Sequence, residues 1–297
     1  MTEGKIIKAI SGFYYVHDGI RVWTCHALGV FRNIGVKPLV GDNVCVEPVD
    51  PEKNEGSLVK VLPRENTLIR PAVANIDQAL IVFAIREPDP NFSLLDRFLI
   101  NMGKQDIPVV IYFNKADIDS ENAGSRYREM YEKAGYRVIC GSTSNESTIE
   151  EIRKELKGKT TVLAGPSGAG KSSLTNRLYK DAGMEVGELS VKLKRGKQTT
   201  RHTEIFPVDE NSYVLDTPGF TSLYVEGVPS DELRHYYPEF SSAAAGCRFL
   251  GCSHVNEPSE ICMVKREVKC GRIEPVRYDS YSQIYKEVKQ NEKKYWF

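Results

Sequence analysis

Residues 165–172 constrain the fold more than any other stretch of this chain. They read Gly-Pro-Ser-Gly-Ala-Gly-Lys-Ser, which matches the phosphate-binding pattern G-x-x-x-x-G-K-S. The apolar run Thr161–Ala164 precedes them and a helical pattern, Ser173–Leu178, follows. Glycines let the backbone curl so that its N–H groups face phosphate oxygens, and the N-terminus of a following helix adds positive potential. The sequence therefore predicts a P-loop within an α/β domain.

Each part of this loop has an expected task. Lys171 would reach the β- and γ-phosphates of a nucleotide, and the hydroxyl of Ser172 would bind Mg²⁺. The residues expected to surround the phosphates are Gly165, Pro166, Ser167, Gly168, Ala169, Gly170, Lys171, Ser172 and Ser173.

A second motif indicates which base is bound. Asn114-Lys115-Ala116-Asp117 reads N-K-x-D and follows an apolar strand expected at Pro108–Phe113. The carboxylate of Asp117 can accept both N1–H and the exocyclic amine of guanine, and adenine presents no such pair of donors. The amide of Asn114 would face the O6/N7 edge, and the stem of Lys115 would cover the base and ribose.

A third stretch would complete the base site. Ser142 and Thr143 follow an expected strand at Arg137–Cys140, where a backbone N–H would meet guanine O6. The combination of these motifs with a P-loop predicts a GTP site.

A further motif, D-T-P-G at 216–219, follows another short apolar strand. Asp216 would hold Mg²⁺ through water, and the N–H of Gly219 would sense the γ-phosphate. Between the P-loop and this motif, Gly196–Arg201 resembles a first switch in which Thr200 offers a hydroxyl to Mg²⁺. The catalytic residues expected from these motifs are Lys171, Ser172, Thr199, Thr200, Asp216 and Gly219.

The order of the motifs is unusual. GTPases ordinarily run P-loop, first switch, D-x-x-G and N-K-x-D, whereas here N-K-x-D comes first and D-T-P-G last. A parallel sheet tolerates such a circular permutation, because chain ends can be rejoined in loops while the strands keep their packing. The switch region then leads directly into the C-terminal segment, so the nucleotide state could be relayed to it.

Two features of the switch region bear on catalysis and partners. Phe220 follows the D-T-P-G motif where many GTPases carry a water-orienting Gln, so we expect slow intrinsic hydrolysis, and the sequence leaves the replacement group open. Residues 191–203 are basic and contain no acidic side chain. They form either a solvated loop or, as we favour, a loop that becomes ordered with GTP and meets a phosphate backbone.

The N-terminal segment, residues 1–66, reads as five short strands separated by turn signals, which suggests a small barrel of the OB type. The expected strands are Lys5–Ile10, Phe13–His17, Arg21–Ala27, Asn43–Val49 and Ser57–Leu62. Several side chains could stack nucleic-acid bases or could form the core: Phe13, Tyr14, Tyr15, Trp23, Phe31 and Arg32. Composition does not decide between these readings.

The C-terminal segment carries the ligand set of a closed structural zinc site. Cys247, Cys252, His254 and Cys262 offer thiolates and an imidazole, and Cys270 could compete with Cys262. Buried free cysteines are the alternative. An aromatic stripe follows at helical spacing and favours a core face over a binding face: Tyr278, Tyr281, Tyr285 and Val288.

Composition limits the remaining choices. Forty basic and forty acidic side chains give zero formal net charge, so a nucleic-acid surface would have to be a local patch. The chain has neither a signal-like start nor an apolar run long enough to span a membrane. Seven cysteines, an odd number, suit a reducing cytoplasm better than a disulfide framework. We expect an OB-type barrel at 1–66, a circularly permuted GTPase domain at 67–223 and a helical zinc-binding domain at 224–297.

Taken together, the barrel, the permuted motifs and the zinc segment resemble the RsgA (YjeQ/YloQ) family of GTPases over essentially the whole chain. Supporting stretches are Leu94–Phe98, Arg195–Lys197, Thr199–Arg201, Asp216–Phe220, Cys247–Phe249 and Glu257-Pro258. The resemblance implies a late assembly factor for the small (30S) ribosomal subunit, which stimulates its GTPase. It also implies that the barrel and zinc domain grip 16S rRNA, that Mg²⁺ accompanies GTP, and that the protein works in the cytoplasm. We expect a monomer that could also accept guanosine tetraphosphate.

Two departures from the family pattern stand out. Gln198 occupies a position where the family commonly has His, and the last zinc ligand comes later than usual because Ser259–Ile261 lengthens the loop. Two other function classes compete with the family reading. A nucleotide-gated RNA-binding module would use slow hydrolysis only to reset binding, and a P-loop kinase would share residues 165–172 but would leave N-K-x-D and D-T-P-G unexplained.

Overall fold

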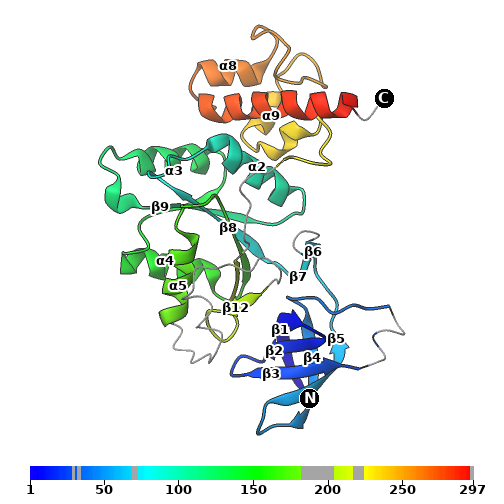
Figure 1. The fold of residues 1–297 in the computed structure, drawn as a ribbon. Helices are drawn as coiled ribbons and strands as arrows, with labels where there is room; N and C mark the ends of the chain where they lie inside the picture. The colour runs from blue at the N-terminus through cyan, green and yellow to red at the C-terminus, as the bar shows by residue number, and fades with distance from the viewer. Residues whose placement is uncertain (29–30, 32–34, 69–71, 182–203, 217–223, 295–297) are drawn as a thin grey trace. The chain divides into compact units, whose positions relative to one another are not determined.

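The computed structural model describes residues 1–28, 31, 35–68, 72–181, 204–216 and 224–294 (Figure 1). By packing, the chain divides into two compact units. The first comprises Met1–Leu80, Thr143–Ala164 and Lys171–Gly219, and the second comprises Ile81–Ser142, Gly165–Gly170 and Phe220–Phe297. This division differs in kind from the three domains expected along the sequence, whose boundaries remain predictions.

The N-terminal strands of the first unit form a closed barrel in the order β1-β2-β3-β5-β4, and β3 and β5 pair in parallel. The strands are β1 (Thr2–Ile10), β2 (Phe13–His17), β3 (Val22–Ala27), β4 (Asn43–Asp50) and β5 (Glu55–Val61). Buried side chains alternate with more exposed ones along β3, β5 and the first half of β4, as expected when one face of each strand fills the barrel. The expected OB-type barrel is therefore confirmed.

The barrel aromatics divide into core and surface residues. Trp23 and Phe31 are only 1% and 5% exposed, so the suggestion that they stack bases is wrong. Trp23 also donates its indole N–H to the Asp18 carboxylate at 2.7 Å. Phe13 is exposed and Tyr14 is partly exposed, which leaves these rings accessible from solvent.

A six-stranded sheet follows the barrel, with the order β10-β9-β8-β11-β13-β12. Its strands are β8 (Gln78–Ala84), β9 (Val109–Asn114), β10 (Arg137–Cys140), β11 (Thr160–Ala164), β12 (Ile205–Pro207) and β13 (Tyr213–Asp216). Every residue of β8 and β11 is buried, which explains their continuous apolar runs. The pairs β9–β10 and β11–β13 are parallel, and β12 joins β13 antiparallel at the edge. A separate two-stranded ribbon contains β6 (Thr67–Leu68) and β7 (Val73–Ala74).

Helices alternate with these strands, as the α/β prediction requires. In the first unit, α4 (Glu146–Leu156) and α5 (Lys171–Asp181) contact each other, and α5 contacts β13. In the second unit, α2 (Phe92–Gly103) begins where the side chain of Asn91 accepts the N–H of Leu94, and α3 (Ala123–Lys133) packs on β9 and β10.

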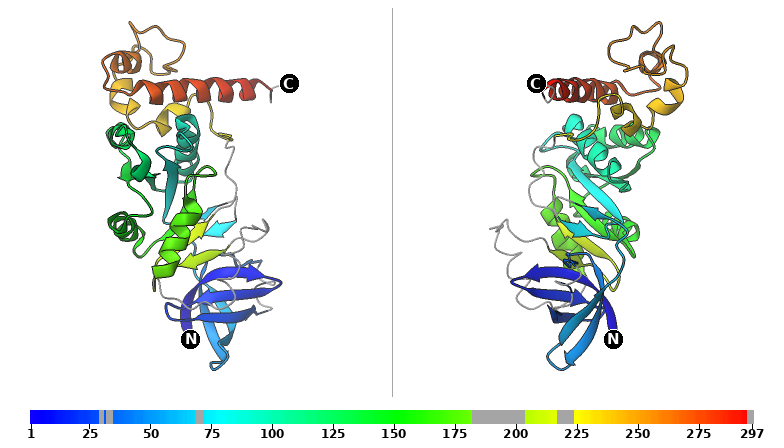
Figure 2. Two further views of the ribbon diagram at one scale, coloured as in Figure 1. Left: turned by 60° about the vertical axis from the view of Figure 1, so that its left-hand side comes forward. Right: turned by 90° about the vertical axis from the view of Figure 1, so that its right-hand side faces the viewer.

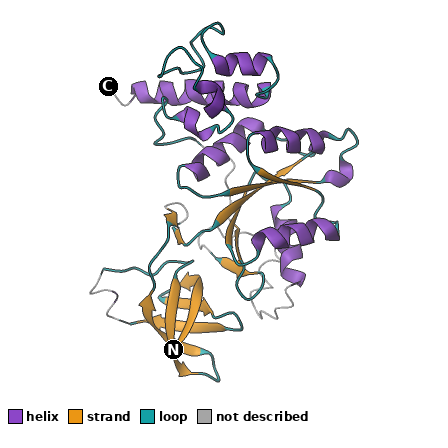
Figure 3. Cartoon of the chain, turned by 180° about the vertical axis from the view of Figure 1, so that it is seen from behind, coloured by secondary structure: helices purple, strands orange, loops and turns teal. Residues whose placement is uncertain are grey.

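The C-terminal segment of the second unit consists of helices and loops (Figure 3). It contains η2 (Leu233–Tyr236), α7 (Phe240–Ala244), α8 (Met263–Lys269) and α9 (Pro275–Lys294). The aromatic stripe of α9 belongs to the core, since Tyr281 and Tyr285 pack in a cluster with Tyr237 and Phe240. Helix α9 also packs against α2 (Figure 2).

A buried ion network joins α9 to α2. Arg277 is 1% exposed, forms an ion pair with the fully buried Asp96, and lies 2.8 Å from a carboxylate oxygen of Glu239. Its guanidinium stacks over the ring of Tyr237, at 4.6 Å from the ring centroid. Burial raises the pKa of Asp96, and the positive charge of Arg277 opposes that rise. The network therefore fixes the helical segment on α2 through groups that satisfy one another.

Among the described residues, no helix combines the length and the apolar character that crossing a membrane would need.

Candidate guanine-nucleotide site and metal centre

Two glycines of the P-loop are required by backbone conformation and by space. Gly165 has a φ of +141°, and a Cβ there would lie 2.1 Å from the carbonyl oxygen of Val82. Gly170 has a φ of +98°, and a Cβ there would lie 2.1 Å from Nδ2 of Asn114. Any other residue at either position would strain the backbone and displace a buried neighbour.

Asn114 connects the N-K-x-D motif to the P-loop. Its side chain is 1% exposed and lies at the end of β9. Nδ2 donates to the carbonyl oxygen of Ala169 at 2.9 Å, and Oδ1 accepts from the hydroxyl of Tyr112 at 2.8 Å. The sequence placed this amide at the guanine edge. The structure gives it protein partners that hold the base motif and the phosphate loop together.

The other two fixed residues of the N-K-x-D motif, Lys115 and Asp117, are more exposed than Asn114. Lys115 adopts the left-handed conformation, with φ 66° and ψ 37°, and its ammonium group donates to the carbonyl oxygen of Glu87. Asp117 lies in the short helix η1 (Ala116–Ile118), where its carboxylate is exposed and accessible to a ligand. The motif thus offers one buried amide and one accessible carboxylate.

The loop after β10 lies beside this motif. The N–H of Gly141 donates to the carbonyl of Phe113, and the N–H of Ala116 donates to the carbonyl of Gly141, both at 3.0 Å. Ser142, the next residue, is buried, and Thr143 is partly exposed. This ladder brings Ser142 near the base motif, which is the neighbourhood that sequence analysis expected for it.

The expected phosphate and Mg²⁺ residues are only partly described. Lys171, Ser172 and Ser173 form the first turn of α5, where the two serines are exposed. Asp216 is the last residue of β13. The remaining assignments lie outside the described residues: Thr199, Thr200, Gly219, Gln198, Phe220 and the basic stretch 191–203.

The cysteine and histidine residues of the C-terminal segment form one cluster. The ligand atoms of Cys247, Cys252, His254 and Cys262 all lie within 4.8 Å of one another. Nδ1 of His254 is 3.7 Å from Sγ of Cys247 and 3.5 Å from Sγ of Cys262. Tetrahedral zinc with bonds of about 2.3 Å to sulfur and 2.0 Å to nitrogen separates these ligands by about 3.5 Å. The cluster therefore fits a tetrahedral ion, whereas Cys270 is exposed and lies outside it.

The loop that carries these ligands is held by neighbouring side chains. The hydroxyl of Tyr278 donates to the carbonyl of His254, and that of Tyr281 to the carbonyl of Ser253, both at 2.7 Å. The ammonium group of Lys265 donates to the carbonyls of Val255 and Glu257. Two residues of the aromatic stripe thus serve as core residues and also as supports of the ligand loop.

The protonation of these ligands also follows from burial. Burial lowers the pKa of His254 to about 4, so its imidazole is neutral and available to a metal near pH 7. Burial raises the pKa of Cys252 to about 12 and also raises the pKa of Cys262. In the absence of a metal these thiols would stay protonated, so binding of a metal ion would have to displace their protons.

Family models match two stretches of the chain. The model described as RsgA GTPase matches residues 61–226, and the model described as RsgA N-terminal domain matches residues 3–57. The chain belongs to the RsgA GTPase family.

Two relatives align with this chain over nearly their whole length. The protein named small ribosomal subunit biogenesis GTPase RsgA from Agathobacter rectalis is 48% identical, with 98% of this chain and 99% of that protein covered. The protein of the same name from Alkaliphilus metalliredigens is 45% identical, with the same coverage of 98% and 99%.

Solved structures give the same fold. YloQ, described as a circularly permuted GTPase, superposes with a TM-score of 0.77 at 35% identity and covers 98% of this chain and 96% of its own. YjeQ from Thermotoga maritima has a TM-score of 0.77 at 33% identity and covers 97% of this chain and 98% of its own.

In this member of the RsgA family, sequence reasoning missed two supports of the nucleotide site. Tyr112 could have been found, because residues two apart on a strand share a face and Tyr112 precedes Asn114 by two. The loop after β8 gave no such signal. There the carbonyl of Glu87 accepts the Lys115 ammonium group, and Pro88 faces Gly168, where an added Cβ would lie 3.3 Å from its Cδ.

Proposed function

We propose that this protein hydrolyses GTP to GDP and phosphate as an assembly factor for the small (30S) ribosomal subunit. It binds 16S rRNA and couples hydrolysis to late maturation of the subunit and to its own release. The observation that carries the nucleotide part is the hydrogen bond between Asn114 and Ala169, which unites the guanine motif with the phosphate loop. The names of the full-length relatives support the ribosomal part.

Residues of this chain would act on GTP mainly by positioning and charge. The accessible carboxylate of Asp117 would select guanine, while the P-loop N–H groups and Lys171 would hold the phosphates. Mg²⁺, which GTPases use with GTP, neutralises charge on the phosphate oxygens when it is bound. Ser172 and Thr200 would hold that ion directly, and Asp216 would hold it through water. The N–H of Gly219 would contact the γ-phosphate.

The remaining assignments concern conditions and partners. We infer one structural zinc ion per chain, held by Cys247, Cys252, His254 and Cys262, because their spacing fits a tetrahedron. Hydrolysis is slow in the isolated protein, since Phe220 cannot orient water, and the 30S subunit stimulates it. The protein acts as a cytoplasmic monomer, and guanosine tetraphosphate competes for the diphosphate part of the site.

Hydrolysis assays with and without purified small subunits test this proposal. We expect a large stimulation by small but not large subunits, GTP preferred over ATP, and no hydrolysis by the Lys171→Ala variant. Tight GTP-dependent binding to the subunit without stimulation would instead favour a nucleotide-gated RNA-binding module. Equal hydrolysis of ATP and GTP would contradict the guanine assignment. If small subunits neither stimulate hydrolysis nor bind the protein, that result would contradict the ribosomal partner.

A further inference from the structure

The barrel of the first unit contacts the β12–β13 hairpin of the same unit through an ion pair. Nζ of Lys8, on β1, lies 3.1 Å from a carboxylate oxygen of Glu204, and the two residues also form an isolated antiparallel backbone bridge. Their side chains are only 15% and 21% exposed. A pair this far removed from water is screened less than a surface pair, so it can hold two elements in register.

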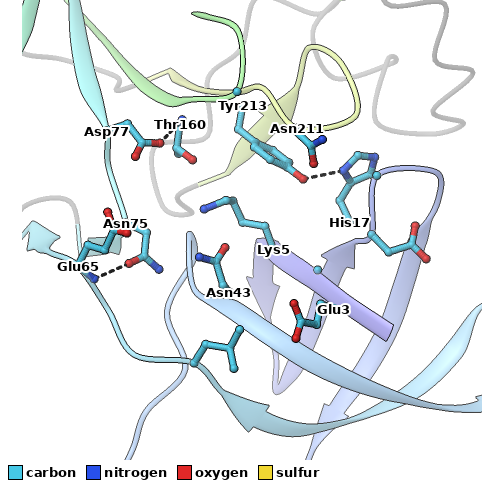
Figure 4. Close-up of a pocket in the computed structure, with 15 residues that line it drawn as sticks. Glu3, Lys5, His17, Asn43, Glu65, Asn75, Asp77, Thr160, Asn211 and Tyr213 are labelled. Carbon is cyan, nitrogen blue, oxygen red and sulfur yellow. Dashed lines mark hydrogen bonds between the residues drawn. The ribbon is translucent and has the colours of Figure 1, made fainter. Parts of the chain in front are cut away.

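A second polar contact lies at the other strand of the hairpin. Nδ1 of His17, on β2, is 3.0 Å from the hydroxyl of Tyr213, and both side chains are buried. The two rings meet edge to face, and the ammonium group of Lys5 lies 5.6 Å above the tyrosine ring (Figure 4). Burial lowers the pKa of His17 and raises that of Tyr213 to about 12, so both groups are neutral near pH 7 and form a neutral hydrogen bond.

The space around these contacts is a polar cavity of about 430 Å³ and not a packed apolar core. Its lining includes Lys5, His17, Asn43, Asp77 and Tyr213, whose side chains point toward one another in Figure 4. Polar side chains around such a cavity can rearrange at a lower cost in free energy than interlocked apolar side chains. They can exchange hydrogen-bond partners with one another or with water without opening a void.

The hairpin leads from both contacts to nucleotide-site residues. Glu204 directly follows the stretch expected to contain the first switch, and Tyr213 starts the strand that ends at Asp216. The hairpin is in register, with Ile205 opposite Leu215, and β13 also pairs with β11, the strand before the P-loop. A displacement at Tyr213 would therefore reach Asp216 along a single paired strand of about 10 Å.

We propose that Glu204 and Tyr213 are positioning residues that couple the barrel to the nucleotide site, with Lys8 and His17 as their partners on the barrel. A nucleotide that changes the position of Asp216 shifts the β12–β13 hairpin, alters these two contacts and so alters the barrel. By reciprocity, a ligand that moves the barrel changes nucleotide affinity by the same factor. This inference rests on the proposed GTP binding but requires no ribosome.

Hydrogen exchange of the barrel strands tests the coupling. Amide exchange of residues 2–17 is measured with GDP and with a non-hydrolysable GTP analogue. In the unaltered protein we expect the exchange rate of β1 and β2 to differ about fivefold or more between the two nucleotides, the lower end of typical coupling. In the Lys8→Met/Tyr213→Phe variant, which keeps the lysine stem and the tyrosine ring, the difference should fall below about twofold.

The matched control is Lys60→Met/Tyr14→Phe, which makes the same two kinds of substitution at barrel positions outside both contacts and should keep the full difference. The inference is overturned if the difference persists in the Lys8→Met/Tyr213→Phe variant, or if the unaltered protein binds both nucleotides without any barrel response. Failure to bind either nucleotide, measured by fluorescence, would instead refute the proposed function. If a melting curve shows the double variant to be unfolded, the single Tyr213→Phe variant replaces it, with an expected partial loss of the difference.

Discussion

Replacement of Asn114 by alanine tests whether this residue of the N-K-x-D motif recognises the base or holds the P-loop. If this amide reads the base, its loss should alter the preference for guanine. If it holds the P-loop, as its bonds to Ala169 and Tyr112 indicate, its loss should weaken all nucleotides alike. Asp117, whose carboxylate is exposed, would keep the discrimination between bases.

The size of the effect follows from the two hydrogen bonds. Alanine leaves the carbonyl of Ala169 and the hydroxyl of Tyr112 without this partner, and a buried polar group left unpaired costs about 1–3 kcal/mol. The hydrogen bond to Ala169 holds the P-loop, so its loss should lower GDP affinity roughly 5- to 150-fold. The Tyr112 bond bears on the end of β9, so the free energy of unfolding should fall by a similar amount of about 1–3 kcal/mol.

Fluorescence titration with guanosine and xanthosine diphosphates measures the nucleotide affinities, and urea denaturation measures the free energy of unfolding. The control is Asn91→Ala, which removes the cap of α2 and should lower stability by about 1 kcal/mol without changing nucleotide affinity. The reasoning is refuted if Asn114→Ala binds GDP within twofold of the unaltered protein. A change of more than tenfold in the ratio of guanosine to xanthosine affinity would equally refute it.

Three further predictions follow from the same structure. Asp117→Asn should weaken GTP and favour xanthosine nucleotides in the same titration, and an unchanged preference would remove this carboxylate from base recognition. Zinc should bind more weakly in acid, because it displaces protons from the thiols of Cys252 and Cys262, whose pKa values burial raises. These two thiols alone should give a loss of about a hundredfold per unit of decreasing pH, and Cys247 is a third thiol ligand, so titration with a competing chelator should show at least that slope. A flat profile would contradict the ligand set. Arg277→Met should lower the free energy of unfolding, measured by urea denaturation, by about 3–5 kcal/mol, because it leaves the carboxylate of Asp96 buried without its cation. The Asp96→Asn change in that background should recover part of the loss.

The sequence by itself determined the local features of this protein. Strands β2 and β10 have the bounds that their sequence patterns predicted. The P-loop, the N-K-x-D motif and their permuted order are also legible without coordinates. These features depend on side-chain periodicity and on short motifs whose chemistry acts over a few residues, so neighbouring letters contain the information.

Only the tertiary structure decided which residues meet. It buried Trp23 in the barrel, gave the Asn114 amide a partner in the P-loop, and brought Cys262 rather than Cys270 into the cysteine–histidine cluster. The ion pair of Lys8 with Glu204 spans 196 residues of sequence. Such contacts arise from how strands and helices pack in space, and since packing joins segments that share no local pattern, no reading of neighbouring residues could have predicted them.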